Sequence, residues 1–276
     1  MPDNDLRQLI EYALSEDLGA GDGTTDATIP AYAVSTAEVL AKQDLVLAGI
    51  DVAREVFRQL DPSVCFTPLS KDGDKIKACT VCARVSGKTR ALLAGERVAL
   101  NLLQHLSGIA TLTAKYVERV RGTSAQVMDT RKTLPGLRQL EKYAVRMGGG
   151  KNHRMGLYDM VLIKDNHIKA AGGITAAVER VRARIQSASP IEVETGTLDE
   201  VKEALSAKAD IIMLDNMPPA LMREAVAFIG GRAIIEASGN VSLENVRDIA
   251  RTGVDRISVG AITHSAPAAD ISMKIK

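Results

Sequence analysis

The sequence predicts an α/β fold in which a small N-terminal α+β domain precedes a (β/α) barrel. Three observations support this prediction. The first hundred residues mix strands and helices in no regular order, the remainder alternates short apolar strands with helical stretches, and polar or glycine residues directly follow the later strands. Regular alternation of strands and helices is typical of a parallel sheet with right-handed crossovers, and an irregular mixture is typical of an α+β domain.

The N-terminal domain is predicted from hydrophobic periodicity. An amphipathic helix carries Leu6, Leu9 and Leu14 on one stripe, and a glycine-rich turn at 19–23 ends it. The predicted elements are a helix at 5–17, a strand at 37–42, a helix at 52–60, a strand at 76–85, and a helix from 90 that ends near Ser107-Gly108. We therefore predict one domain over residues 1–108, with the tail 265–276 packing back on it, and a barrel domain over residues 109–264.

The barrel domain is predicted from six short apolar segments separated by helical patterns. The strands are expected at 126–129, 160–164, 191–194, 211–215, 233–237 and 256–259, and the helices at 175–186, 198–207, 219–229 and 243–252. Six is the minimum number of strands that this pattern supports.

The carboxyl ends of the six strands distinguish a barrel from an open sheet. They read Asp129-Thr-Arg-Lys132, Lys164-Asp-Asn-His167, Glu194-Thr195, Asp215-Asn216, Ser238-Gly-Asn240 and Ser258-Val-Gly260. In a barrel all strand ends meet at one rim, where active sites are built. An open doubly wound sheet spreads them along an edge and uses only the switch point. Six polar ends therefore favour the barrel.

The composition excludes several classes of function. Thirty-five Lys and Arg stand against thirty-four Asp and Glu, which gives a formal net charge of +1. A protein that coats nucleic acid or an anionic membrane needs a large excess of basic surface, so neither partner is expected. No apolar run reaches about 18 residues, and the N-terminus has no signal-peptide pattern. We expect a cytoplasmic protein.

The three cysteines predict no disulfide framework. Cys79 and Cys82 match a C-x-x-C pattern, but no second Cys or His pair completes a zinc site. In the predicted strand, residues three apart point to opposite faces. We therefore expect both to be small packing residues.

A basic segment lies at residues 129–169. It contains nine Lys and Arg and four Asp and Glu, a local charge of +5, so the rest of the chain sums to −4. Ion pairs along a helix explain Glu141, Lys142 and Arg146, but not the cations beside strand ends and glycines. The latter are Arg131, Lys132, His153, Arg154 and Lys164. Few aromatic residues are available for stacking, so the segment predicts a small ligand with several anionic groups rather than a polymer.

Two carboxylates and two glycine-containing turns complete the predicted site. Glu194 and Asp215 each end a strand, and a pair of carboxylates near a phosphate calls for a hard cation such as Mg²⁺ between them. The turns at Ser238-Gly-Asn240 and Gly260-Ala261 offer backbone N–H groups to a phosphate, at the position usual for a barrel.

The motifs carry a resemblance to a known family. Thr130–Arg138, Gly148–Arg154 and Leu162–His167 closely resemble quinolinate phosphoribosyltransferase, the carboxylating nicotinate-nucleotide pyrophosphorylase of NAD biosynthesis. The resemblance covers nearly the whole chain. It implies an N-terminal sandwich and an incomplete, seven-stranded α/β barrel that works as a homodimer or a larger assembly. The implied reaction joins quinolinate to phosphoribosyl pyrophosphate and yields nicotinate mononucleotide, pyrophosphate and CO₂.

The resemblance also implies a role for each site residue. Substrate-binding positions are Arg97, Thr130, Arg131, Lys132, His153, Arg154, Lys164, Glu194, Asp215, Ser238, Gly239, Asn240, Val259, Gly260 and Ala261. Of these, Lys132, Lys164, Glu194 and Asp215 are the expected catalytic residues, and Glu194 and Asp215 also face Mg²⁺. Arg97 is expected to enter the site of a neighbouring subunit.

Three alternatives remain at this point. A barrel aldolase or isomerase would use Lys164 as a Schiff-base nucleophile, but such a lysine needs an apolar pocket and this one lies among charged residues. A sensor would not need the carboxylate pair. A related phosphoribosyltransferase found with molybdate-transport proteins would use another acceptor, and the intact basic set, Arg97 included, favours quinolinate.

Overall fold

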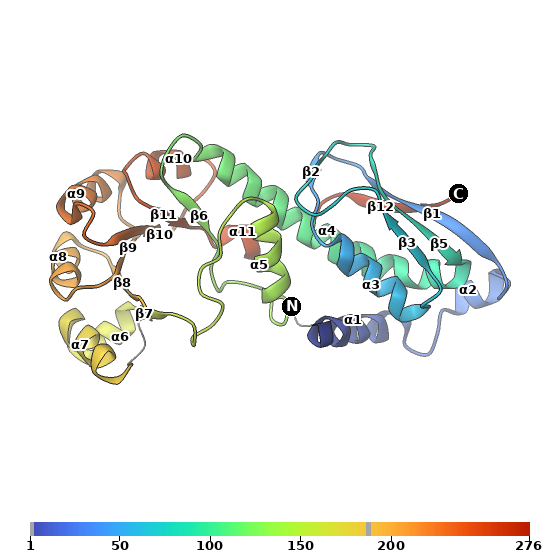
Figure 1. Ribbon diagram of the computed structural model, residues 1–276, viewed down its shortest axis with the longest axis horizontal. Coiled ribbons are helices and arrows are strands. Elements are labelled where there is room, and N and C mark those ends of the chain that lie inside the picture. Colours follow the sequence, from blue (N-terminus) through green and yellow to red (C-terminus); the bar gives the residue numbers. More distant parts are fainter. Residues whose placement is uncertain (1–2, 186–188) are drawn as a thin grey trace. The chain divides into compact units, whose positions relative to one another are not determined.

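The computed structural model describes residues 3–185 and 189–276, and the chain divides into two compact units. The N-terminal unit comprises Met1–Ala114, Leu134–Gly149 and Ala266–Lys276, and the barrel unit comprises Lys115–Thr133 and Gly150–Ser265. Figure 1 gives the elements of both units. Within the described ranges, no helix is both long enough and apolar enough to cross a membrane.

The N-terminal unit is built on a four-stranded antiparallel sheet in the order β12-β1-β5-β3. Its strands are β12 (Ile271–Ile275), β1 (Val34–Ala41), β5 (Val81–Lys88) and β3 (Cys65–Pro68), and a small pair, β2 (Leu45–Val46) and β4 (Lys75–Ile76), lies apart from it. Alternate residues of β1, namely Ala37, Val39 and Ala41, are buried. The C-terminal tail thus adds a strand to this unit through β12.

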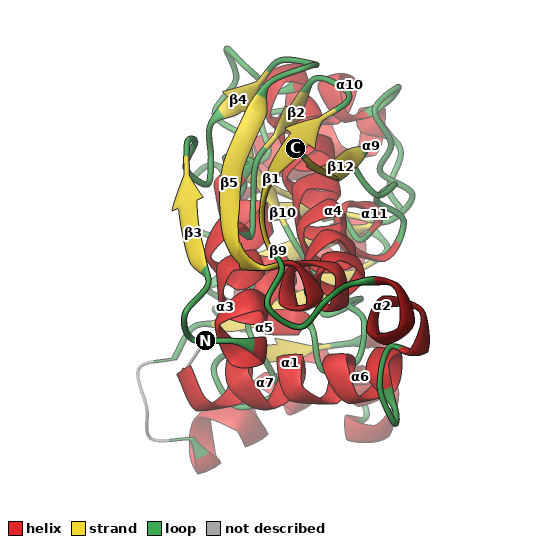
Figure 2. Cartoon of the chain, turned by 90° about the vertical axis from the view of Figure 1, so that its right-hand side faces the viewer, coloured by secondary structure: helices red, strands yellow, loops and turns green. Residues whose placement is uncertain are grey.

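Five helices belong wholly or mostly to the N-terminal unit. They are α1 (Asp3–Leu18), α2 (Gly23–Thr28), α3 (Ile50–Leu60), α4 (Thr89–Arg119) and α5 (Arg138–Met147). Helices α3 and α4 lie along one face of the sheet (Figures 1 and 2). Phe57 of α3 stacks on Phe66 of β3, with 6.1 Å between ring centroids. The aliphatic and aromatic core of the unit lies between these layers.

Helix α4 is longer than predicted. The sequence predicts an end near Ser107-Gly108, whereas the helix continues to Arg119, so the predicted boundary after residue 108 falls inside it. A side chain at Gly108 would place its Cβ 2.1 Å from the carbonyl oxygen of Pro267. Gly108 is therefore explained by the close approach of the C-terminal segment and not by helix termination.

The predicted strand at 76–85 is also corrected. The structure divides it into β4 and β5, because the chain turns at residues 77–80 and Cys79 adopts a left-handed conformation with φ of 65°. Cys82 is buried in β5 as predicted, but Cys79 is exposed. The prediction that Cys79 packs in the interior is therefore wrong.

The barrel unit is built on six parallel strands in the order β6-β11-β10-β9-β8-β7. Their bounds are β6 (Gln126–Met128), β7 (Val161–Ile163), β8 (Ile191–Thr195), β9 (Ile211–Asp215), β10 (Ile234–Ser238) and β11 (Arg256–Ser258). All six predicted strands are present. Their apolar residues, such as Val193, Ile212 and Ile257, are fully buried, as expected for a parallel sheet covered on both faces.

Helices alternate with these strands and lie outside the sheet (Figure 1). They are α6 (Asp165–Ala171), α7 (Ile174–Arg184), α8 (Leu198–Ser206), α9 (Pro219–Ile229), α10 (Val246–Ala250) and α11 (Ala261–His264). Local sequence sets their ends: Thr197 and Glu200 form a capping box at the start of α8, and Gly230 ends α9 in a left-handed conformation. The predicted helix at 175–186 reaches residue 186, which lies outside the described residues.

The barrel is incomplete. The resemblance implies seven strands, whereas the described residues of the barrel unit contain six strands and one isolated bridge, in which Lys151 pairs in parallel with Met128 of β6. The Lys151 amide donates to Val127 and its carbonyl accepts from Asp129. The seventh position is thus occupied by a single residue, and the sheet does not close on itself.

We predict that Gly108→Ala destabilises the protein by about 1–3 kcal/mol, the range usual for an overpacked core. In an open helix the same substitution would be favourable, but here the new Cβ would overlap the Pro267 carbonyl. The free energy of unfolding from urea denaturation measures the effect. Gly23→Ala is the control, since its Cβ would meet nothing within 4 Å. A Gly108→Ala variant as stable as the unmodified chain would contradict the packing argument.

Candidate active site

A cavity of about 590 Å³ lies within the barrel unit at the carboxyl ends of its strands. It is lined by four Lys and Arg residues, two His, two carboxylates and several small residues: Thr130, Arg131, Lys132, His153, Arg154, Leu162, Lys164, Glu194, Met213, Asp215, Asn216, Ser238, Gly239, Asn240, Val241, Ser258, Gly260, Ala261 and His264. This volume suits a small molecule. The Lys and Arg side chains outnumber the carboxylates by two, so the lining favours an anion.

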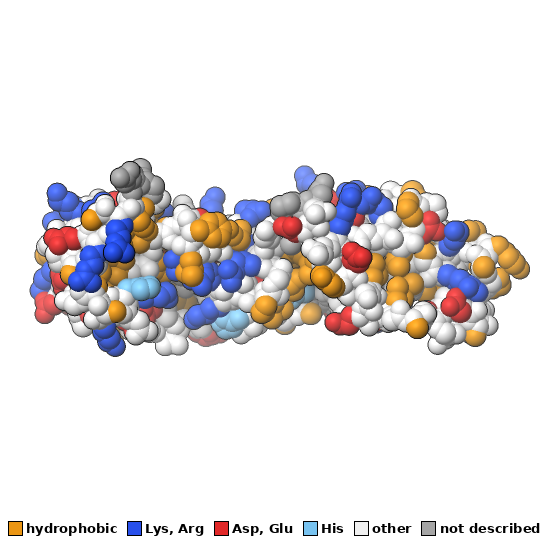
Figure 3. All heavy atoms as spheres, turned by 90° about the horizontal axis from the view of Figure 1, so that it is seen from below, with side chains coloured by type: hydrophobic (Ala, Val, Ile, Leu, Met, Phe, Trp, Pro, Cys, Tyr) orange, Lys and Arg blue, Asp and Glu red, His pale blue; other side chains and the backbone are white. Residues whose placement is uncertain are grey.

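The cavity lining is more basic than the chain as a whole, whose formal net charge is +1. On the face drawn in Figure 3, Lys and Arg side chains stand among Asp, Glu and hydrophobic side chains. The cations of the cavity come from separate strand ends: Arg131 and Lys132 follow β6, and Lys164 follows β7. Residues distant in sequence therefore meet because parallel strands end at one rim.

A buried carboxylate holds the segment that carries His153. Asp129 is fully buried at the end of β6, and its oxygens accept hydrogen bonds from the backbone N–H of His153 at 2.8 Å and from the side chain of Asn152 at 2.5 Å. Asp129 was not among the predicted site residues. Its position between a strand and the Thr130-Arg-Lys132 motif was the available signal.

The turn after β11 is shaped by Lys132. A Cβ at Gly260 would lie 3.0 Å from Cδ of Lys132, and the hydroxyl of Thr263 donates to the Lys132 carbonyl at 2.7 Å. A side chain at residue 260 would therefore press against the lysine side chain where it crosses the turn. This arrangement places a cation over the backbone that the sequence predicts to bind phosphate.

The turn after β10 is shaped by Asn216. A Cβ at Gly239 would lie 2.2 Å from Oδ1 of Asn216. Asn216 Nδ2 donates to Asp215 at 2.7 Å, and Asn216 Oδ1 accepts from Asn240 at 3.0 Å. Asn216 and Asn240 both have positive φ, of 54° and 49°, which is uncommon outside glycine. Asn216 thus ties the Asp215 carboxylate to the glycine turn, a role that sequence reasoning missed.

Glu194 and Asp215 are the pair predicted to face Mg²⁺. They end the neighbouring strands β8 and β9 and line the same cavity. The Lys164 ammonium lies 3.4 Å from Glu194. Two carboxylates facing an open cavity fit an ion that takes its remaining oxygen ligands from a phosphorylated substrate and water. They do not form an all-protein cage.

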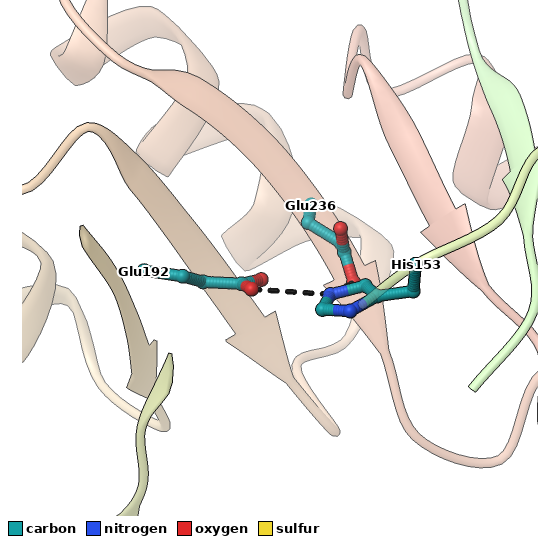
Figure 4. A group of neighbouring side chains, drawn as sticks. All are labelled: His153, Glu192 and Glu236. Carbon is teal, nitrogen blue, oxygen red and sulfur yellow. Dashed lines mark ion pairs between the residues drawn. The ribbon is translucent and has the colours of Figure 1, made fainter. Parts of the chain in front are cut away.

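Below these residues lies a buried cluster of His153, Glu192 and Glu236 (Figure 4). Nε2 of His153 is 3.1 Å from Glu192 and 3.4 Å from Glu236, and both glutamates are fully buried. The three donor atoms lie within 4.8 Å of one another, a spacing that a metal ion could also use. A direct ion pair explains the short distances, because two buried carboxylates require a nearby positive charge.

The cluster holds a proton more tightly than its members would separately. Burial alone lowers the pKa of His153, but its contacts with Glu192 and Glu236 outweigh burial and raise this pKa to about 9. Burial raises the pKa of Glu192 against the opposing effect of His153. Burial and the neighbouring Arg131 lower the pKa of Arg154, although a guanidinium remains charged. Interacting groups of this kind titrate as one unit.

The structure brings most of the predicted site residues together. Thirteen of the fifteen line the cavity. Val259 does not, since it is buried behind the turn after β11. Arg97 lies exposed on α4 in the N-terminal unit and does not line the cavity.

The fold and the cavity define a class of protein: an incomplete α/β-barrel enzyme whose rim suits a small, multiply anionic molecule beside a carboxylate pair and two glycine turns. Comparison with known families agrees. The quinolinate phosphoribosyl transferase C-terminal domain matches residues 109–274, and the N-terminal domain of the same name matches residues 22–107. The chain belongs to the quinolinate phosphoribosyltransferase family.

Individual relatives cover nearly the whole chain. A probable nicotinate-nucleotide pyrophosphorylase (carboxylating) of Synechocystis is 48% identical over 96% of this chain and 91% of its own length. Quinolinate phosphoribosyltransferase (decarboxylating) 1 of Nicotiana glauca is 46% identical over 99% of this chain and 83% of its own. The solved nicotinate-nucleotide pyrophosphorylase of Francisella tularensis superimposes with a TM-score of 0.97 at 41% identity, covering 100% and 98% of the two chains.

We predict that His153 makes stability depend on pH. Its folded pKa is raised to about 9 from an ordinary value of 6.5. The stabilisation is therefore complete below pH 6.5 and disappears as the pH rises through 9, a loss on the order of 3 kcal/mol. Urea denaturation between pH 6.5 and 9.5 should show a steeper loss of stability for the unmodified chain than for His153→Gln. Equal slopes would contradict the assignment.

Proposed function

We propose that this chain transfers the 5-phosphoribosyl group of phosphoribosyl pyrophosphate to quinolinate and releases pyrophosphate and CO₂, giving nicotinate mononucleotide for NAD biosynthesis. Family membership supports this reaction. The observation that carries it is the cavity itself, where cations suited to two carboxylates and a pyrophosphate stand beside Glu194 and Asp215. Neither a Schiff-base enzyme nor a sensor needs that combination.

Quinolinate is assigned to the basic side of the cavity. Arg131, Arg154 and Lys164 offer two planar guanidinium groups and one ammonium, and a guanidinium can bind a carboxylate through two hydrogen bonds. Arg154 is held in place by its donation to the Met160 carbonyl at 3.1 Å. The two carboxylates of quinolinate would thus bind to different cations, and this would orient the ring nitrogen toward the ribose.

Phosphoribosyl pyrophosphate is assigned to the opposite side. The turns Ser238-Gly-Asn240 and Gly260-Ala261 offer backbone N–H groups to the 5′-phosphate, and Lys132 crosses the second turn. Glu194 and Asp215 would hold Mg²⁺ together with the pyrophosphate oxygens. When bound, this ion would neutralise negative charge on the departing pyrophosphate.

The residues of the chain act mainly by position and charge. The pyridine nitrogen attacks ribose C1 as the C1–pyrophosphate bond breaks, and Glu194 and Asp215 favour the positive charge that develops at C1. The product is a cationic pyridinium ring. When the 2-carboxylate leaves as CO₂, the electron pair of the broken bond is accepted by this ring, and a proton then replaces the carboxylate. An organic cofactor is therefore not needed.

One assay tests the proposal directly. Purified protein is incubated with quinolinate, phosphoribosyl pyrophosphate and Mg²⁺, and CO₂ and nicotinate mononucleotide are measured. Both products are expected in equal amounts. Turnover with nicotinate but not with quinolinate would overturn the substrate assignment. The cytoplasmic location expected from the composition stays a prediction.

We predict that Arg131→Ala raises the KM for quinolinate by roughly 10- to 100-fold, since losing a charged hydrogen bond costs about 1.5–3 kcal/mol. The KM for phosphoribosyl pyrophosphate should change much less. Lys169→Ala is the matched control, because it removes an exposed cation of the same basic segment outside the cavity. An unchanged KM for quinolinate in Arg131→Ala would remove Arg131 from the substrate site.

We also propose that the active enzyme is a homodimer in which Arg97 completes the site of its partner. Arg97 is exposed and does not line the cavity of its own chain, and no hydrogen bond or ion pair engages its guanidinium among the described residues. An arginine of this kind is available to a second subunit. Two-fold dimers with shared residues are common among oligomers.

Mixing two inactive variants tests the shared site. Arg97→Ala and Lys164→Ala are each expected to lose most activity. In a mixed dimer one site contains both intact residues and the other contains neither, so random reassembly of equal amounts should restore about a quarter of the sites. Activity is measured after joint unfolding and refolding, with each variant refolded alone as the control. No recovery in a mixture shown to contain mixed dimers would contradict the shared site.

A further inference from the structure

Two buried glutamates have no part in the reaction as described above. Glu192 of β8 and Glu236 of β10 each precede a cavity residue, Glu194 and Ser238, by two positions. Residues two apart on a strand point to the same side. Both glutamates therefore point to the same side of the sheet as these cavity residues, and Figure 4 shows them turned toward the His153 ring.

The ion pair with His153 does not satisfy both glutamates completely. Both side chains are completely buried, and Glu192 Oε1 and Glu236 Oε2 accept no hydrogen bond from the residues that the structure describes. A buried carboxylate with incomplete pairing is costly, and apolar side chains of similar volume would commonly be more stable. Such groups call for a functional explanation.

The contacts of the two glutamates differ. Glu192 lies 3.1 Å from Nε2 of His153. Glu236 lies 3.4 Å from the same atom and also accepts a hydrogen bond from the hydroxyl of Ser258 on β11. Ser258 lines the cavity and stands two residues before Gly260, whereas His153 lines the cavity directly before Arg154, which is assigned to quinolinate. Glu236 is thus in contact with both halves of the site.

His153 is held from its other side as well. Its Nδ1 lies 2.8 Å from the backbone nitrogen of Arg154, and its own backbone N–H donates to Asp129 at 2.8 Å. The backbone of His153 is therefore held by Asp129, and its ring is held at Nε2 by the two glutamates.

We propose that Glu192 and Glu236 are positioning residues: Glu192 orients His153 for quinolinate, and Glu236 orients both His153 and Ser258, so that it couples the quinolinate side to the phosphate side. This inference rests on the proposed function. Neither glutamate touches substrate, since both lie below the cavity lining and are absent from it.

Three conservative variants give three different results. Glu192→Gln should raise the Kd for quinolinate roughly tenfold and leave the KM for phosphoribosyl pyrophosphate within about twofold, a change that corresponds to one lost polar contact. Ser258→Ala should raise only the KM for phosphoribosyl pyrophosphate. Glu236→Gln should raise both. Calorimetry with quinolinate alone measures the Kd, and initial rates at saturating quinolinate measure the KM.

A double-mutant cycle separates positioning from general damage. In a His153→Ala background, Glu192→Gln should raise the Kd for quinolinate no further, because the contact that it alters is already absent. Glu224→Gln, an exposed glutamate on α9, is the control and should change neither constant. Melting temperatures confirm that each variant is folded.

Three results would overturn the inference and leave the proposed function intact. They are equal changes of both constants in all three variants, a full additional effect of Glu192→Gln in the His153→Ala background, and normal quinolinate binding by Glu192→Gln. If the unmodified chain itself bound no quinolinate, the proposed function would fail together with the inference.

Discussion

Three carboxylates buried in an aliphatic barrel impose the constraint on which the rest of the site depends. Asp129, Glu192 and Glu236 are each fully buried. A carboxylate in such surroundings must be met by donors or by positive charge. Asp129 accepts hydrogen bonds from Asn152 and the His153 backbone, and the two glutamates form ion pairs with the His153 ring. The loop that follows Lys151 therefore has little choice of conformation, and Arg154 enters the cavity as a consequence.

The glycine turns after β10 and β11 depend on steric room. A Cβ at Gly239 would overlap the Asn216 amide, and a Cβ at Gly260 would press against the Lys132 side chain. Asn216 and Asn240 accept strained left-handed backbone to make this fit. Strain of this kind persists only where the surrounding contacts fix it. The two sides of the cavity are thus rigid for different reasons, and Glu236 and Ser258 link them.

Much of this fold could be predicted from the sequence, because apolar periodicity and polar strand ends are local signals. The six strands and their polar ends were predictable from segments such as 211–215, where four buried apolar residues are followed directly by a polar, partly exposed one. The end of α4 could not be predicted, because Gly108 is needed for close packing against the Pro267 carbonyl and not to end the helix. Pro267 is 159 positions away in the chain. The contacts of Glu192 and Glu236 could not be predicted either. A single Glu inside an apolar strand indicates a buried carboxylate, but only the folded barrel brings His153 next to it.

The coexistence of cations and carboxylates at one rim restricts which reactions the cavity can favour. Cations alone would bind an anionic ligand more tightly, because Glu194 and Asp215 repel it and Glu194 also lies 3.4 Å from the Lys164 ammonium. The carboxylates help only where positive charge faces them. In the proposed reaction, a bound metal ion would supply that charge in the ground state and the ribose C1 would supply it in the transition state. A cavity that weakens ground-state anion binding but stabilises a transient cation suits group transfer from a pyrophosphate, and simple retention of a ligand would not require it.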